Sequence, residues 1–156
     1  MGFIINTLVY LLIVPVLLFI VVRKIDKRYH VGGDIRLLAL ACTLFALAMF
    51  YPTPLIHGQN TQFTTHLIGG GVMVGLLWIY FMPLMRKWEW WQQAIMLYVA
   101  VSALGVLNEL YELFAYEIGM STVPLTDTSW DLFANTLGAL IVYIVYWLVK
   151  TLFKQR

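Results

Sequence analysis

This sequence of 156 residues has little charge and a single cysteine. Charged side chains make up 12% of the chain against 62% hydrophobic ones, and the mean hydropathy is +0.82. So few polar groups cannot cover the surface of a water-soluble domain, which excludes a soluble globule and predicts an integral membrane protein. Because Cys42 has no second cysteine, neither an internal disulfide nor a zinc site built on paired cysteines can form.

The motifs of several enzyme classes are also missing. The chain has no G-x-S-x-G nucleophile turn, no phosphate-binding loop and no dinucleotide fingerprint. No basic segment precedes the first apolar run, residues 3–22, so we expect a retained membrane helix and not a cleaved signal peptide. The basic residues cluster at the membrane surface, where anionic lipid headgroups account for them, and we therefore expect no nucleic-acid partner.

The apolar runs predict an all-α, polytopic membrane protein in which residues 1–156 form a single transmembrane domain. A helix needs about 20 apolar residues to cross roughly 30 Å of hydrocarbon. Pro15 is expected to kink the first helix, and Pro52 and Pro54 to end the second. The five expected spans are residues 3–22, 35–51, 65–82, 92–116 and 130–152.

Five spans would place all ten basic residues on one side of the membrane. By the positive-inside rule this side is the cytoplasm, with the N-terminus outside and the C-terminus inside, in a plasma (inner) membrane. The opposite side then carries His57, His66 and most of the acidic residues. Five of the eight carboxylates fall there: Glu109, Glu112, Glu117, Asp127 and Asp131.

Polar residues of the last three spans are expected at matching depth. Each of these spans carries a polar row at helical spacing that includes a glycine. Such rows can face one another across a tight bundle, and Gly71 with Gly75 lets another helix approach closely, including one from a partner or from a second copy. The rows are His66, Gly70 and Met73; Gly105, Asn108 and Glu112; and Asp131, Asn135 and Gly138.

The grouped acids and the histidine predict a metal site. A carboxylate within hydrocarbon costs a few kcal/mol, so it normally faces protein or a water-filled cavity. Carboxylates with one imidazole are ligands for a divalent cation, and without a cation they would repel one another. The predicted metal ligands are His66, Glu109, Glu112, Asp127 and Asp131, with Asn108 and Asn135 as supporting residues. The predicted catalytic groups are Glu109, Glu112 and His66.

Structural roles stay open for some of these residues. Asp127 and Asp131 also suit the cap of the fifth helix, and Asn108 and Asn135 suit hydrogen bonds between helices. Glu117 is expected to be solvated outside the pocket.

Three stretches resemble the VanZ-like group of small multi-span bacterial membrane proteins. They are His66-Leu-Ile-Gly-Gly-Gly71, Asn108-Glu-Leu-Tyr-Glu112 and the segment 127–139, which resembles that group's Asp-Leu-x-x-Asn-x-x-Gly-Ala pattern. The resemblance covers roughly residues 60–145 and implies a role in the cell envelope without naming a reaction. This chain has Thr64-Thr65 where members often have Asp-Lys, and Glu112 without an arginine where they often have Gln and Arg, so it is more anionic.

Three functions fit these features. The first is a metal-assisted enzyme or binding site for an envelope lipid or lipid-linked intermediate. The second is a protein that binds or conducts cations or a cationic solute, although the inner half of the bundle offers almost no polar groups for a path. The third is a non-catalytic subunit of a larger membrane complex.

Overall fold

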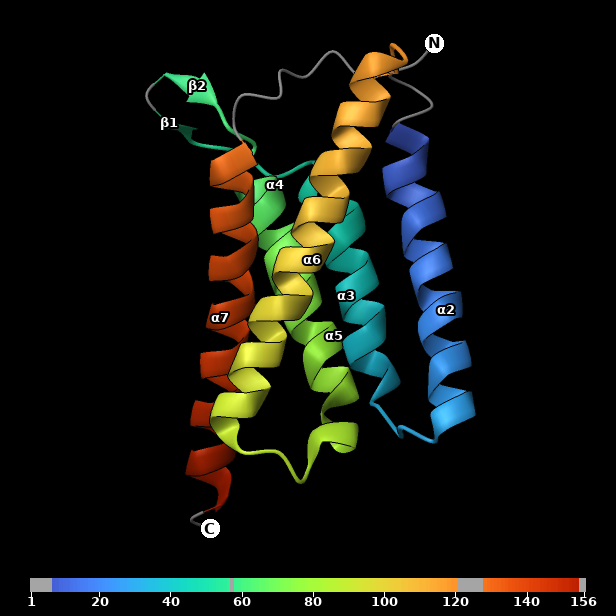
Figure 1. Cartoon of the computed structure of the whole chain (residues 1–156), viewed down its shortest axis with the longest axis vertical. Coiled ribbons are helices and arrows are strands. Elements are labelled where there is room, and N and C mark those ends of the chain that lie inside the picture. The colour runs from blue at the N-terminus through green and yellow to red at the C-terminus, as the bar shows by residue number, and fades with distance from the viewer. Residues whose placement is uncertain (1–6, 57, 121–127, 155–156) are drawn as a thin grey trace.

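The computed structural model describes residues 7–56, 58–120 and 128–154, and within these ranges it is an elongated all-α bundle (Figure 1). A short β-hairpin, β1 with β2, lies at one end. Two π-helical segments, η1 and η2, and one 3₁₀ segment, η3, interrupt the α-helices. The elements are η1 (Val9–Ile13), α2 (Val14–Tyr29), α3 (Ile35–Ala48), β1 (Leu55–Ile56), β2 (Gln59–Asn60), α4 (Phe63–Thr65), η2 (His66–Val72), α5 (Met73–Phe81), η3 (Met82–Met85), α6 (Trp90–Glu117) and α7 (Thr128–Lys154).

Three of the described segments are long and apolar enough to cross a membrane: Phe63–Met85, Trp90–Glu117 and Thr128–Phe153. They correspond to the third, fourth and fifth predicted spans. The helix α3 has only 14 residues and ends at Ala48, short of the predicted residue 51. It ends there because a turn follows, in which the Phe50 amide donates to the Leu47 carbonyl ahead of Pro52.

The first helix changes its winding where the sequence places a proline. The π-helical turn η1 ends at Ile13, and Pro15 stands in the first turn of α2, where its missing N–H is tolerated. The neighbouring helix α3 contacts the first helix at this point, because the Cys42 thiol donates to the Pro15 carbonyl oxygen at 3.5 Å.

The tightest helix crossing in the bundle lies between η2 and α7. A Cβ added at Gly71 would lie 2.7 Å from the Gly138 Cα, and one added at Gly75 would lie 2.7 Å from the Val142 Cβ. The predicted small-residue pair therefore packs against α7 of the same chain. On the other side of the third span, Gly69 faces Ala48 of α3. A partner protein or second copy at this span stays a prediction.

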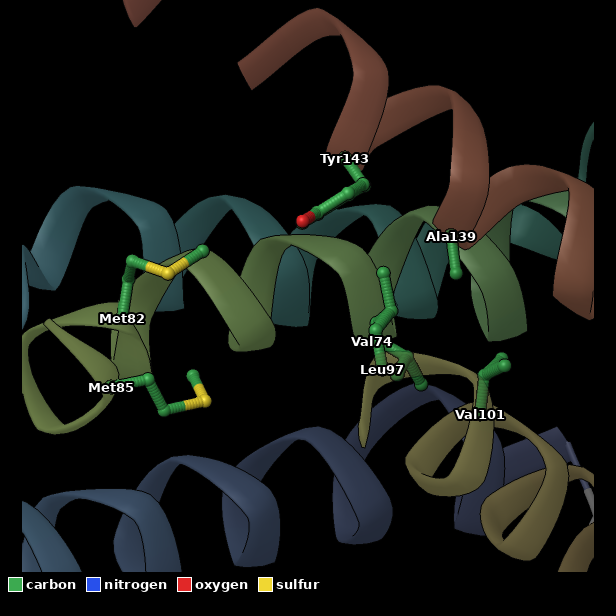
Figure 2. Close-up of a cluster of buried hydrophobic side chains, with 7 residues drawn as sticks. All are labelled: Val74, Met82, Met85, Leu97, Val101, Ala139 and Tyr143. Atoms are coloured by element: carbon green, nitrogen blue, oxygen red, sulfur yellow. The ribbon is translucent and has the colours of Figure 1, made fainter. Parts of the chain in front are cut away.

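An apolar core joins the last three long helices away from the hairpin (Figure 2). Its buried side chains are Val74, Met82, Met85, Leu97, Val101, Ala139 and Tyr143. The Tyr143 hydroxyl donates to the Trp90 carbonyl at 2.6 Å, and Gln93 Nε2 donates to the carbonyls of Met85 and Trp88 at 3.1 and 3.0 Å. These bonds fix the turn between η3 and α6.

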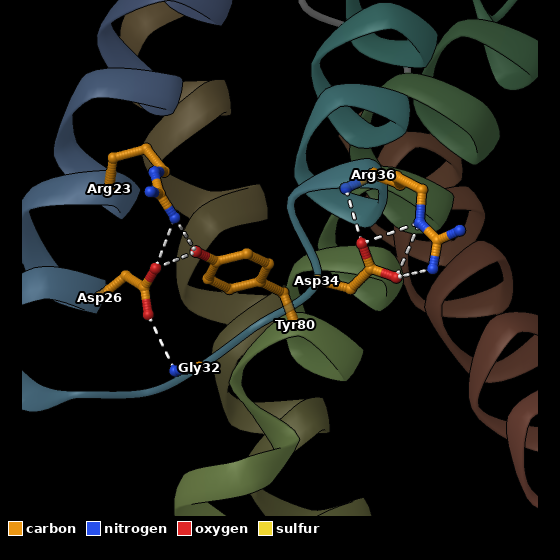
Figure 3. A network of polar contacts seen from close by, with 6 residues as sticks. All are labelled: Arg23, Asp26, Gly32, Asp34, Arg36 and Tyr80. Carbon is orange, nitrogen blue, oxygen red and sulfur yellow. Dashed lines mark hydrogen bonds and ion pairs between the residues drawn. The ribbon is translucent and has the colours of Figure 1, made fainter.

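The end of the bundle opposite the hairpin, here called the basic end, carries the loops at 30–34 and 86–89 and the end of α7 (Figure 1). A polar network there ties α2 to α5 (Figure 3). The Tyr80 hydroxyl donates to Asp26 at 2.8 Å, Arg23 pairs with the same carboxylate at 2.6 Å, and the Gly32 amide donates to it at 2.9 Å. The first helix is thus attached to the bundle by a buried carboxylate.

Candidate functional site

The candidate site lies where the third span changes from α-helix to π-helix. The short helix α4 passes directly into the π-helical segment η2, whose first residue is His66. The glycines Gly69, Gly70 and Gly71 follow, and they let α3 and α7 approach the helix closely. The imidazole of His66 is only 7% exposed as a result. Single π turns in long helices occur frequently at functional sites.

His66 lies against acidic side chains from two other helices. Its Nε2 is 3.4 Å from Asp131 Oδ1 of α7 and 3.9 Å from Glu112 Oε1 of α6. Metal-ligand atoms of His66, Glu109 and Asp131 all lie within 4.8 Å of one another. The structure therefore brings together three of the five predicted metal ligands, with Glu112 beside them.

The two glutamates of α6 are placed differently around His66. Glu109 belongs to the three-residue cluster, whereas Glu112 borders a cavity and accepts a hydrogen bond from Asn108 Nδ2 at 2.6 Å. Residues four apart on a helix share a face, which is why this bond forms. Asn108 thus orients the Glu112 carboxylate.

The helix α7 contributes its two most buried polar side chains. Asp131, in the first turn, is 2% exposed and Asn135 is 4% exposed. Asn135 Oδ1 has no hydrogen-bond partner among the described residues, although it is buried and Asn135 lines the cavity. A buried amide oxygen without a donor is costly, and this oxygen packs against Gly70 while the rest of the Asn135 side chain adjoins the cavity.

A cavity of about 410 Å³ adjoins these groups between the first helix, α3, η2, α5 and α6. Its polar wall residues are Tyr10, Gln62, Thr65, His66, Asn108, Tyr111, Glu112 and Asn135. Gly70 and Gly105 also line it, and a Cβ would press on Asn135 at Gly70 and on Leu132 of α7 at Gly105. The absence of a side chain at Gly70 therefore makes room for Asn135 in the cavity wall.

Other predicted residues lie away from this cluster. Asp127 and His57 fall outside the described residues. Glu117 is exposed at the last position of α6, as expected for a solvated residue outside the pocket.

Two tyrosines at the site were not predicted from the sequence. The rings of Tyr10 and Tyr111 meet edge to face with 5.8 Å between centroids, and both residues line the cavity. Tyr111 stands between the two glutamates in the 108–112 stretch, and Tyr10 is the tyrosine of the first apolar run. These positions in the sequence were the signals that could have identified the two tyrosines as site residues.

The donor set suits a divalent ion that accepts mixed nitrogen and oxygen ligands, such as Zn²⁺ or Mn²⁺. Two ligand atoms about 2.1 Å from one ion at a tetrahedral angle lie roughly 3.4 Å apart. The His66 to Asp131 separation of 3.4 Å has this spacing, and Glu109 is close enough to join with a small side-chain adjustment. The cluster therefore has donor atoms within metal-ligand distance, next to the cavity that His66 lines.

The resemblance to the VanZ-like group stays a prediction carried by its three motifs. Comparison with protein-family models, with curated proteins and with solved structures gives no match to this chain.

Proposed function

We propose that this protein is a membrane-embedded, metal-dependent enzyme that acts on the headgroup of a cell-envelope lipid or lipid-linked intermediate. The observation that carries the proposal is the convergence of His66, Glu109 and Asp131 from three helices within 4.8 Å. A second observation is Asn135, which lines the adjoining cavity and whose buried Oδ1 has no donor among the described residues. Together they supply ligands for an ion and a polar contact for a bound molecule.

The residues divide into chelating and proton-transferring groups. His66, Glu109 and Asp131 would hold the ion, which would supply the polarisation of a water molecule or a phosphate oxygen. Glu112 is the general base: its carboxylate takes the proton from the attacking water, and Asn108 keeps it oriented at 2.6 Å. Asp127 is a further ligand in this proposal.

The membrane arrangement of the proposal has five spans, with the N-terminus outside and the C-terminus in the cytoplasm. Arg23, Arg36, Arg86 and Lys150 lie on or next to elements that meet at the basic end. The segments η2 and α7, which carry His66 and Asp131 in their first turns, begin toward the hairpin end (Figure 1). The positive-inside rule then directs the site to the outer face of the plasma (inner) membrane.

Cation permeation is the weaker candidate. Away from His66 the cavity wall consists of apolar side chains, among them Leu18, Val74, Leu77 and Val101. A conducted cation would lose its hydration there without replacement ligands.

The test is elemental analysis of the purified protein, combined with an assay of headgroup release from phosphatidic acid in mixed micelles. We expect stoichiometric metal in the wild type and in the control Glu117→Gln, and loss of metal and activity in Glu109→Gln. A wild-type protein without bound metal after purification in Zn²⁺ or Mn²⁺ would overturn the proposal. Metal binding without lipid chemistry, combined with cation flux in liposomes, would support permeation instead. Stable co-purification with one partner, unaffected by the acid substitutions, would support an accessory subunit.

A further inference from the structure

The cavity beside His66 is divided into a polar part and an apolar part. The polar part contains His66, Asn108, Glu112 and Asn135. The apolar part is lined by Val14, Leu18, Val74, Leu77, Val101 and Leu104. This division matches a molecule with one polar end and a hydrocarbon body.

The whole cavity, from its polar end to Leu77, fits within one membrane leaflet. The 11 steps from His66 to Leu77 would rise by roughly 16 Å in a pure α-helix at about 1.5 Å per residue, and the more tightly stacked π-helical turns of His66–Val72 shorten this rise. Half of a hydrocarbon core about 30 Å thick is roughly 15 Å. A chain seated along Leu77 with its polar end at His66 would therefore keep the depth that it has in the bilayer.

The volume of the cavity favours a single chain. At about 410 Å³ it lies in the lower part of the range of roughly 300–1,000 Å³ that small-molecule sites occupy. Its two sides come from α2, through Val14 and Leu18, and from α6, through Val101 and Leu104. A second chain of the same lipid would remain in the surrounding bilayer.

Aromatic rings close the hairpin end of this space. The Tyr10 ring contacts Tyr111 of α6 at 5.8 Å and Phe45 of α3 at 6.1 Å between centroids. Tyr10 thereby joins the first helix to two others above the apolar walls.

We propose that this cavity binds one hydrocarbon chain of a membrane lipid and presents the lipid's anionic headgroup to the His66 cluster. The inference rests on the proposed function for the role of the headgroup, and it names the substrate class as a lipid recognised through one chain. Acyl and isoprenoid chains share the chemistry that these walls recognise.

The experiment uses the full-length protein in lipid nanodiscs with two photoreactive probes. One is phosphatidic acid with a diazirine in the middle of an acyl chain, and the other is a polyprenyl phosphate with a diazirine in its chain. We expect mass spectrometry to place the adducts on the cavity residues of α2 and α6. Labelling by one probe and not the other identifies the source of the chain.

Neighbouring leucines provide matched variants. Leu18 lines the cavity, whereas Leu17 beside it is exposed on the same helix. Leu18→Trp should reduce labelling several-fold by filling the cavity, and Leu17→Trp should leave it unchanged. On α6, Leu104 lines the cavity and Leu107 does not, although both are exposed, at 46% and 61%. Leu104→Trp compared with Leu107→Trp therefore repeats the test if an α2 variant does not fold.

The outcomes separate this inference from the proposed function. Glu109→Gln should lose the metal and keep the labelling, since the chain is held by apolar walls. Equal labelling of the two variants in each pair, or adducts confined to residues that do not line the cavity, would overturn chain binding while leaving the metal site intact. Labelling without any bound metal in the wild type would instead refute the enzymatic proposal alone.

Discussion

His66 Nε2 lies 3.4 Å from Asp131 Oδ1, although the two residues begin different transmembrane-length segments. Both side chains are buried, at 7% and 2% exposure. A buried carboxylate needs a strong partner, and here the neighbouring groups are an imidazole and a second carboxylate. This relationship is the basis of the metal prediction, because an ion would satisfy all three groups together.

Asp131→Asn should weaken metal binding at least about 10-fold, since it removes a charged ligand while keeping the shape of the side chain. Competition against a chelator of known affinity measures the change in the dissociation constant. Asp34→Asn is the control, because Asp34 caps α3 at the basic end and pairs with Arg36 at 2.7 Å. If Asp131→Asn bound the metal as tightly as the wild type, Asp131 would have only a structural role at the start of its helix.

Glu112→Gln should retain the metal and lower kcat by about 10²–10⁴-fold, the usual contribution of a general base. The Asn108 hydrogen bond to Glu112 predicts a smaller loss in Asn108→Ala, because the carboxylate would remain but lose its orientation. The two variants are compared by turnover of phosphatidic acid and by metal content. Simultaneous loss of metal in Glu112→Gln would reassign Glu112 as a ligand.

Much of this arrangement could be predicted from the sequence because helical spacing alone places residues on a face. The rows through His66, Glu112 and Asp131 are periodic, and their depths follow from the rise per residue. The three segments of membrane-crossing length likewise follow from apolar runs.

Other features depend on packing that periodicity does not encode. The π-helical winding from His66 to Val72, the hairpin at Leu55–Ile56 and the cavity each depend on contacts between distant segments. The first span was too generic to indicate that Tyr10 would reach Tyr111. The hydrogen bond between Asp26 and Tyr80 was likewise not predictable, because Asp26 lies in a basic stretch of the sequence and Tyr80 comes from another helix.

Gly71→Ala should destabilise the bundle by about 1–3 kcal/mol, the usual cost of overpacking. The added methyl group would stand 2.7 Å from the Gly138 Cα, which is backbone and can move only if η2 and α7 separate. Thermal unfolding in detergent measures the loss. Ala103→Leu adds more volume on an exposed position of α6 and should change the melting temperature little. Equal stability of Gly71→Ala and wild type would show that the two helices can separate freely.

Tyr80→Phe should lower the melting temperature and make it less dependent on pH, because Tyr80 is fully buried and its hydroxyl donates to Asp26 at 2.8 Å. That hydrogen bond, with those of the neighbouring backbone amides and the Arg23 charge, holds the pKa of Asp26 below its ordinary value. A carboxyl whose pKa is lower in the folded state stabilises the fold above its unfolded pKa of about 4, and this stabilisation is lost as the pH falls through the lowered value.

Melting temperatures between neutral and strongly acidic pH, measured in detergent, check this linkage between Asp26 and stability. The wild type should lose stability on acidification, and Tyr80→Phe should lose less because part of the stabilisation is already gone. Tyr29→Phe, at an exposed position of α2, is the control and should follow the wild type. If the melting temperatures of Tyr80→Phe and wild type fell in parallel with pH, the stabilisation by the Asp26 carboxylate would not depend on Tyr80. The first helix would then be attached to the bundle by its apolar contacts with α3 instead.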